Sequence, residues 1–401
     1  MNLTQLRTRL KPRYAWMSAG GLAMAVLVAC GGGAGTASTA GTSTTSASSS
    51  GPITGFGSIF VNGVRIDDSA AVTTLDDDSS GGDADLKLGM MVDVDADTDA
   101  NGNPAKATAI SARSFVQGPI STISVANNQL TLLGMTVTVS PRTVFDGAGV
   151  TGLASLNAGD GIEVHGLADA TGGVKATRIE RKASATTDIR VTGTVQSTDS
   201  TSLTINGVKV KYQTANLVNM PNGVVTGMLV RVKGTLSGTD IVASKVREVR
   251  YGPKLKENQR TEVDGVVTAF TSATSFEVNG LSVSVPATVQ VQGTVARGVR
   301  VEVKGQVTNN VLVASKVEVQ DESREADDAH ELHGSIFSLD VTGKSFTMRD
   351  GSLTVKWDSN TTFDPSSLST GAAGLSTGLR IEIKGKVVGN VLIATSIQID
   401  K

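Results

Sequence analysis

The chain has 401 residues, of which 45 are glycine and only 3% are aromatic. Its formal net charge of −2 lacks the basic excess that is typical of nucleic-acid-binding proteins, so the sequence predicts no nucleic-acid partner. The single cysteine, Cys30, excludes both an intramolecular disulfide framework and a cysteine-rich metal site.

The N-terminus predicts a secreted, lipid-anchored protein. Four basic side chains in residues 5–13 precede a small and apolar segment, which is the layout of a signal peptide, here residues 1–29. The segment ends in Leu27-Val28-Ala29-Cys30, which resembles the lipobox of bacterial lipoproteins. The resemblance implies cleavage before Cys30 and membrane attachment through its acyl chains. The alternative, a transmembrane helix, normally needs about 20 apolar residues, more than this segment offers.

The residues after Cys30 predict the localisation of the protein and a flexible tether to the membrane. Residue 31 is Gly rather than Asp. By the same resemblance this implies lipid anchoring at the outer membrane of the cell envelope, facing the periplasm or the surface. Residues 31–50 contain only Gly, Ala, Ser and Thr, so a flexible tether over residues 30–50 is expected.

A repeated pattern of two strands and a tight turn follows five times, most clearly in residues 301–319. Apolar and polar residues alternate, as in half-buried strands. The copies place the repeats at residues 51–113, 114–181, 188–250, 261–320 and 330–401, with short polar linkers between the last four. Each repeat has five strand-like runs. The predicted fold class is therefore all-β, with five tandem small five-stranded antiparallel barrels that are OB-like. A generic five-stranded barrel or sandwich fits the same pattern.

The charges of the repeats are unequal. Residues 51–113 contain eleven Asp and four Arg or Lys, a balance of −7, whereas residues 188–250 contain four acidic and eight basic residues, a balance of +4. This asymmetry predicts contacts between repeats or between molecules.

The repeated phrases are similar to those of a known bacterial family. They are Thr-Gly-x-Val, Thr-x-Phe at residues 143–145 and 361–363, and Gly-x-x-Ile/Val-Glu-Val/Ile-x-Gly at residues 159–166 and 378–385. The family is a domain of unknown function that occurs in tandem in secreted lipoproteins and is regarded as OB-like. The resemblance covers nearly all of residues 52–400, although Ala96 replaces the last Gly in repeat 1. It implies a fold and an envelope location, but no activity and no catalytic residues.

One candidate metal site lies in repeat 1. Asp97, Asp99 and Asn101, followed by Gly102, match the first half of a calcium-binding loop, in which alternate residues supply oxygen ligands. The twelfth position is Thr108, where such a loop requires a bidentate Glu. Turn formation alone explains the same residues. The sequence therefore predicts no cofactor, and calcium at this turn is the alternative.

A candidate ligand-binding face lies in the basic third repeat. Lys209, Lys211, Arg231 and Lys233 occupy alternating polar positions that could bind an anionic glycan or simply be solvated. Two other matches lack the required context. Gly374-x-Ser376-x-Gly378 is not followed by a helix or by a later His, and Gly147-x-Gly149-x-x-Gly152 has no room for a long helix. His330 and His333 are expected on opposite faces of one strand.

Together these features predict a non-catalytic, lipid-anchored envelope protein that acts as a structural or protein-interaction module. The alternative is a binding module for an envelope glycan or another anionic polymer, assisted by calcium. A hydrolase would require a set of catalytic residues that the sequence does not contain.

Overall fold

The computed structural model describes residues 46–184, 187–250, 252–320, 330–348, 353–388 and 391–400. The predicted signal peptide, Cys30 and most of the predicted tether lie outside these residues. Each of the five predicted repeats forms strands.

The first three repeats contain strands that follow a similar order along the chain. Repeat 1 contains β1 (Ser46–Gly55), β2 (Ile59–Val61), β3 (Val64–Ile66), β4 (Val72–Leu75), β5 (Ser79–Gly81), the 3₁₀ turn η1 (Asp83–Asp85), β6 (Met91–Thr98) and β7 (Pro104–Ala112). Repeat 2 contains β8 (Val116–Ser124), η2 (Val125–Asn127), β9 (Gln129–Leu132), β10 (Met135–Thr138), β11 (Val144–Asp146), η3 (Leu153–Ser155), β12 (Gly161–Ala168) and β13 (Val174–Arg181). Repeat 3 contains β14 (Ile189–Thr198), β15 (Ser202–Ile205), β16 (Val208–Lys211), β17 (Asn216–Val218), β18 (Leu229–Ser237) and β19 (Asp240–Glu248).

The last two repeats follow the same order. Repeat 4 contains β20 (Arg260–Ser272), β21 (Ser275–Val278), β22 (Leu281–Ser284), β23 (Val291–Gln292), β24 (Arg300–Thr308) and β25 (Val311–Val319). Repeat 5 contains β26 (His330–Ser335), β27 (Ser338–Asp340), β28 (Ser345–Met348), β29 (Leu353–Lys356), β30 (Thr362–Phe363), η6 (Gly371–Gly374), β31 (Arg380–Val388) and β32 (Val391–Ile399).

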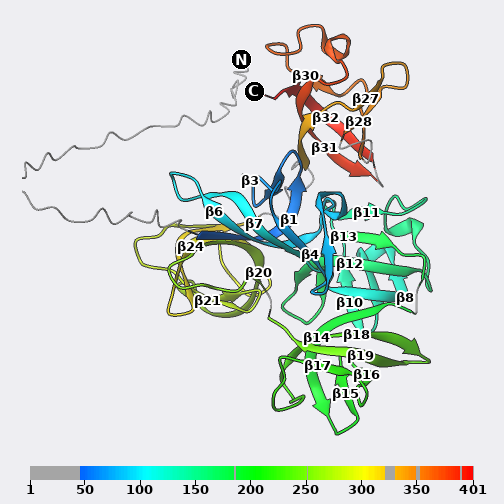
Figure 1. The fold of residues 1–401 in the computed structure, drawn as a ribbon, viewed down its shortest axis with the longest axis vertical. Helices are drawn as coiled ribbons and strands as arrows, with labels where there is room; N and C mark the ends of the chain where they lie inside the picture. Colours follow the sequence, from blue (N-terminus) through cyan, green and yellow to red (C-terminus); the bar gives the residue numbers. More distant parts are fainter. Residues whose placement is uncertain are drawn as a thin grey trace, which may run out of the picture. The chain divides into compact units, whose positions relative to one another are not determined.

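The strands of each repeat close into a barrel, as in repeat 3, drawn in green in Figure 1. β14 pairs with β15, β15 with β16, β16 with β19, β19 with β18, and β18 with β14, which closes the ring. The short β17 pairs with β19 outside this ring. A closed ring in the order first, second, third, fifth and fourth strand is OB-like, so the predicted fold class is confirmed.

One pairing differs from the all-antiparallel prediction. The third and last main strands run parallel, in β10–β13, β16–β19, β22–β25 and β29–β32. In repeat 1 the parallel partner of β7 is β4. Parallel neighbours need a long crossover connection. The stretch between the third and fourth main strands provides that connection, and it also carries the short extra strand.

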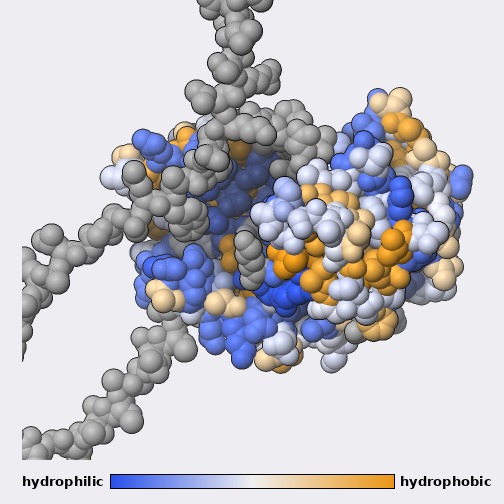
Figure 2. All heavy atoms as spheres, turned by 90° about the horizontal axis from the view of Figure 1, so that it is seen from above, coloured by the Kyte–Doolittle hydropathy of each residue, from blue (hydrophilic) through white to orange (hydrophobic). Residues whose placement is uncertain are grey.

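Alternation along the strands decides which side chains enter the core. In β24, Val301 and Val303 are fully buried, while Glu302 and Lys304 lie on the outer face. Burying one such valine contributes about 1.5 kcal/mol or more. The core of repeat 4 is built mainly of valine, with Phe276 as its one buried aromatic side chain. On the outside, hydrophilic and hydrophobic residues are interspersed over the face seen in Figure 2.

In three repeats, the hairpin between the second and third strands closes with an Asn-Gly pair in which both residues have a positive φ, at residues 62–63, 206–207 and 279–280. The asparagine has a second role. Asn279 Nδ2 donates to the carbonyl oxygen of Asp264 on the first strand, at 3.3 Å. A Cβ on Gly265 would lie 2.3 Å from the same amide nitrogen. Gly265 therefore makes room for this asparagine, as Gly193 of the Thr-Gly-x-Val phrase does for Asn206 in repeat 3.

A second feature that recurs among the barrels is a β-bulge in the fourth main strand. The register shifts at Gly166, Gly234, Gly305 and Gly385. A Cβ on Gly305 would lie 2.2 Å from the carbonyl oxygen of Val313 on the facing strand. In repeat 1 the shift occurs at Ala96, so the backbone spacing there accommodates a methyl group.

We expect Gly305→Ala to lower the free energy of unfolding by about 2 kcal/mol, because the clashing atom is a backbone oxygen that cannot turn aside. Urea-induced unfolding measures the change. The matched variant Ala96→Gly should cost only about 0.5–1 kcal/mol, the entropic cost of a strand glycine. Equal losses in the two variants would contradict the explanation.

Strand pairing also links different repeats. β1 of repeat 1 pairs parallel with β20 of repeat 4, and β8 of repeat 2 pairs antiparallel with β14 of repeat 3. The described strands of repeat 5 form a separate sheet. The sequence pattern predicts strands but not these partners.

β1 begins within the last five residues of the predicted tether. Residues 46–50 form the first half of β1, between β6 and β20. Ala47 to Ser50 are buried. Their small side chains fit between the neighbouring strands. Because they lack apolar alternation, composition alone assigned them to the tether.

Candidate functional site

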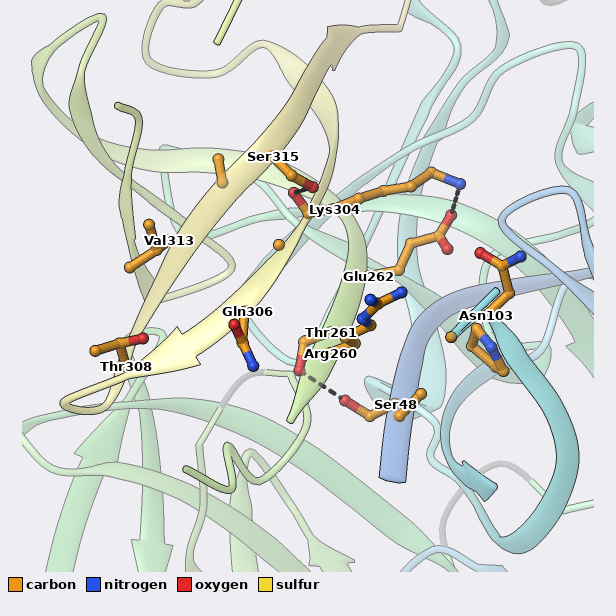
Figure 3. Close-up of a pocket in the computed structure, with 15 residues that line it drawn as sticks. Ser48, Asn103, Arg260, Thr261, Glu262, Lys304, Gln306, Thr308, Val313 and Ser315 are labelled. Carbon is orange, nitrogen blue, oxygen red and sulfur yellow. Dashed lines mark hydrogen bonds and ion pairs between the residues drawn. The ribbon is translucent and has the colours of Figure 1, made fainter. Parts of the chain in front are cut away.

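A cavity of about 540 Å³ lies where β1, the β6–β7 turn and strands β20, β24 and β25 meet (Figure 3). Its lining combines apolar surface with hydroxyl, amide and charged groups, the polar ones from Ser48, Asn103, Arg260, Thr261, Glu262, Lys304, Gln306 and Ser315. The strand register positions them, because Ser48 lies beside Thr261 and Glu262 lies opposite Lys304. Such a surface offers a ligand both apolar contacts and hydrogen-bonding groups.

The central charged group of this cavity is Glu262, which is 5% exposed. Figure 3 shows its carboxylate directed at Lys304, whose Nζ lies 2.7 Å from Oε1. The same ammonium lies 3.3 Å from Glu302. Burial raises the pKa of Glu262 to about 7, and the neighbouring Glu302 adds to the shift while Lys304 opposes it. The cavity therefore holds a carboxyl group that titrates near neutral pH.

This raised pKa makes stability depend on pH. Between the ordinary value of 4.5 and about 7, the folded chain binds a proton at Glu262 that the unfolded chain has lost. We therefore expect the free energy of unfolding to fall as pH rises through this window, by on the order of 1–3 kcal/mol. Glu262→Gln should remove this dependence and be the more stable protein at pH 8. Urea unfolding at several pH values tests it, and identical pH profiles for the two proteins would contradict it.

The hydroxyl side of the cavity is formed by β1 and β20. Ser48 Oγ and Thr261 Oγ1 are 3.0 Å apart, and both residues are almost fully buried. Arg260 lies at the exposed end, where its Nη1 donates to the carbonyl oxygen of Asn101 at 2.7 Å. The cavity thus combines a cation at its mouth with hydroxyl groups on its wall.

A second cluster surrounds residues Asp76, Asp77 and Asp78, here called the acidic turn, which connects β4 and β5. Asp76 pairs with Arg190. Asp77 lies 2.8 Å from Arg113 and 2.9 Å from Arg231. Asp78 contacts three further bases of repeat 3, within 3.1 Å, namely Lys233, Lys245 and Arg247. The acidic repeat 1 therefore inserts its carboxylates among bases of repeat 3, and the contact that the charge asymmetry predicts is confirmed.

The acidic turn is strained as well as charged. Asp76 and Asp77 have φ values of +47° and +72°, a region that favours glycine or asparagine. Burial raises the pKa of Asp77, but the charges of Arg231 and Arg113 outweigh it and hold that pKa below its ordinary value. The hydrogen bond from Lys233 lowers the pKa of Asp78 to about 2. Both carboxylates are therefore ionised at neutral pH, and the ion pairs hold the strained turn in place.

The four bases predicted to bind a glycan do not form one stripe, because they lie on two strands that β19 separates. Lys209 and Lys211 are exposed on β16, and Lys211 pairs with Asp240 at 2.9 Å. On β18, Arg231 is 8% exposed and Lys233 is half-buried, and both bind the acidic turn. The predicted face is corrected accordingly: half of it is already covered by repeat 1.

Of the three predicted calcium ligands, Asp99 and Asn101 lie in the hairpin turn between β6 and β7. Asp99 Oδ1 accepts the backbone N–H groups of Asn101 and Asn103, both at 2.8 Å. Asp169 accepts the corresponding N–H groups in repeat 2, at 2.7 and 2.8 Å. Turn formation therefore accounts for Asp99, while Asp97 lies at the end of β6. Calcium binding here stays a prediction.

The remaining site predictions fall on the histidines and on the N-terminus. His330 is half-buried, and desolvation lowers its pKa to about 4, whereas His333 lies on the outer face of β26 beside Glu331 and opposite Glu382. Cys30 lies outside the described residues. Within the described part of the chain, no helix combines the length and apolar character that a membrane span requires.

Comparison with known proteins decides the family. The model of a "Domain of unknown function (DUF5666)" matches residues 50–111, 117–180, 192–247, 264–318 and 333–398. The chain belongs to this family. Each DUF5666 match coincides with one barrel and ends one residue before the end of its last main strand. No curated protein matches the chain.

Among solved structures, the chain is similar to Drosophila Unr CSD456. The sequence identity is 13%, and the match covers 51% of this chain and 97% of that chain, with a TM-score of 0.14. A TM-score this low supports no conclusion about fold or function. The OB-like character of the DUF5666 repeats stands on their own strand order.

Proposed function

We propose that this DUF5666 protein is a non-catalytic, lipid-anchored component of the cell envelope, whose barrels form a structural or protein-interaction module. The proposal rests on ion pairs between repeats, which are formed by charged side chains on the outer faces of the barrels. In repeats 1 to 3 these faces are neutralised by neighbouring repeats, for example at Asp77, Arg231 and Arg190. Charged groups that hold barrels together serve an architectural role rather than a catalytic one.

The lipid anchor is proposed from the lipobox-like segment before Cys30. Multiple acyl chains give stable membrane attachment, whereas one is marginal. The Ser, Thr, Ala and Gly residues between Cys30 and β1 would keep the first barrel away from the bilayer. In this arrangement the barrels present their outer surfaces to other envelope components.

Metabolic labelling with an alkyne fatty acid tests the anchor. The protein should incorporate the label and sediment with membranes, and Cys30→Ala should do neither. Because Cys30 is the only cysteine, S-acylation has no other site. Gly31→Asp is the matched variant: it should keep the label but move the protein from outer-membrane to inner-membrane fractions. Label retained by Cys30→Ala would refute the proposal.

A second candidate function, binding of an envelope glycan, is supported by the hydrogen-bonding groups of the cavity beside β1 and β20. Its hydroxyl, amide and charged groups are of the kinds that hydrogen-bond sugars. Binding of envelope glycan fragments by the full chain, with and without calcium, tests it. Arg260→Ala at the cavity mouth should weaken binding about tenfold, an effect of about 1.4 kcal/mol, and Lys211→Ala outside the cavity should not. Equal effects, or no binding, would leave the architectural proposal alone.

A further inference from the structure

Three potential metal ligands meet on the outer face of repeat 5. His333 on β26 lies directly opposite Glu382 on β31, and Glu331 precedes His333 by two residues on the same face of the strand. Leu332, between them, is buried in the core, so the barrel fixes the direction of its neighbours. Within the described residues, this is the one group of three or more His, Cys, Asp or Glu side chains with converging ligand atoms.

The ligand atoms are close enough for one cation. The candidate atoms of the three residues all lie within 4.8 Å of one another, and His333 Nε2 is 3.0 Å from Glu331 Oε1. Donors bound to one transition-metal ion at about 2.1 Å are at most about 4.2 Å apart. Small side-chain rotations therefore bring all three into a coordination sphere.

Surrounding groups hold the ligands in place. Asp400 Oδ1 lies 3.1 Å from His333 Nδ1, on the side of the ring away from Glu331. Gln398 Nε2 donates to Glu382 Oε2 at 2.6 Å. Phe60 stacks on the imidazole, with ring centroids 4.9 Å apart and planes inclined by 9°. A carboxylate behind a ligating histidine is a recurring feature of metal sites, because it fixes the tautomer and orientation of the ring.

One cation already lies near the carboxylates. Lys384 Nζ is 3.4 Å from Glu331 Oε2 and 3.5 Å from Glu382 Oε1. Its side chain is 48% exposed, so it can move into solvent when another cation takes its place. The ammonium therefore competes with a metal ion without blocking it.

Repeat 2 provides an internal comparison. His165 Nε2 lies 3.1 Å from Glu163 Oε1, which reproduces the His–Glu spacing of repeat 5. There, however, Arg190 lies 3.1 Å and Lys182 3.5 Å from the other carboxylate oxygen. Bases already neutralise this glutamate, whereas in repeat 5 two glutamates share one mobile lysine.

We propose that Glu331, His333 and Glu382 form a site for a divalent first-row transition-metal ion, with Zn²⁺ as the best fit. One imidazole nitrogen and two carboxylate oxygens are ligands that Zn²⁺ accepts. Three protein ligands leave a coordination position for water or for a group from a partner molecule. The site is separate from the cavity and from the calcium-like turn.

Isothermal titration calorimetry with Zn²⁺ alone tests the site. The untagged full-length protein is kept in detergent and first treated with EDTA to remove bound metal. We expect one Zn²⁺ to bind per chain, at the site in repeat 5. His333→Gln should weaken its binding at least tenfold, and His165→Gln should not. Circular dichroism of each variant confirms that the barrels remain folded.

Lys384→Ala distinguishes loss of a ligand from misfolding. It should tighten Zn²⁺ binding three- to tenfold, because it removes the competing ammonium. Damage to the fold cannot produce that gain. No measurable binding at 100 µM Zn²⁺, equal effects of the two histidine variants, or unchanged binding in Lys384→Ala would overturn the proposal.

Discussion

Asp77→Ala should destabilise the protein by about 3–5 kcal/mol, the range expected when one partner of a buried ion pair is removed. The cost arises at Arg231, which is 8% exposed and keeps only neutral hydrogen-bond partners, the carbonyl oxygen of Ser114 and the hydroxyl of Thr192. A buried guanidinium that loses its paired carboxylate is left with an uncompensated desolvation penalty. Urea-induced unfolding followed by circular dichroism measures the loss.

Two further variants make this prediction specific. Asp240→Ala removes the partner of Lys211, a pair on the exposed side of the same repeat, and should leave stability unchanged within error. Combining Asp77→Ala with Arg231→Met should recover most of the loss, because the buried guanidinium that Asp77 neutralises is then removed as well. If Asp77→Ala costs no more than Asp240→Ala, the acidic turn does not hold the repeats together.

The same residues show how far sequence reasoning reaches. The excess of Asp in repeat 1 and of bases in repeat 3 predicts an attraction between them. It does not predict that Asp76 to Asp78 sit at one turn facing β18 and β19, because strand register and barrel closure bring those bases together. Lys209 and Lys233 look equivalent in an alternating pattern, and only the fold separates the exposed residue from the paired one.

The barrels themselves were more predictable than their connections. Alternating residues such as Val301 and Val303 mark strands, and Asn279-Gly280 marks a turn, because both signals are local. The parallel pairing of β22 with β25 depends on a crossover and leaves no local mark. The sequence does not reveal the cluster of potential metal ligands for a similar reason. His333 and Glu382 are far apart in the chain and meet only through the register of β26 with β31.

The second large prediction concerns residues 46–50, the first half of β1. A chain that begins at Gly51 should be less stable than one that begins at Ser46 by about 3–5 kcal/mol. The shorter chain loses the pairing of residues 46–50 with β6 and residues 47–50 with β20. It also loses the hydrogen bonds from Ser50 Oγ to Asp93 and between Ser48 and Thr261. Each bond contributes about 0.5–1.5 kcal/mol, so several together reach the expected loss.

The truncation also creates unpaired strand edges. Without residues 46–50, the backbone groups of β20 that face β1 become available to another chain, and exposed edges favour aggregation. We therefore expect the Gly51 chain to elute partly as aggregates in size-exclusion chromatography, and the Ser46 chain to remain monodisperse. A third chain that begins at Ser46 and carries Ser48→Ala separates the two effects, since it keeps the strand and loses only the hydroxyl contact with Thr261. If all three chains unfold at the same urea concentration, residues 46–50 act as part of the tether after all, and the first barrel is complete without them.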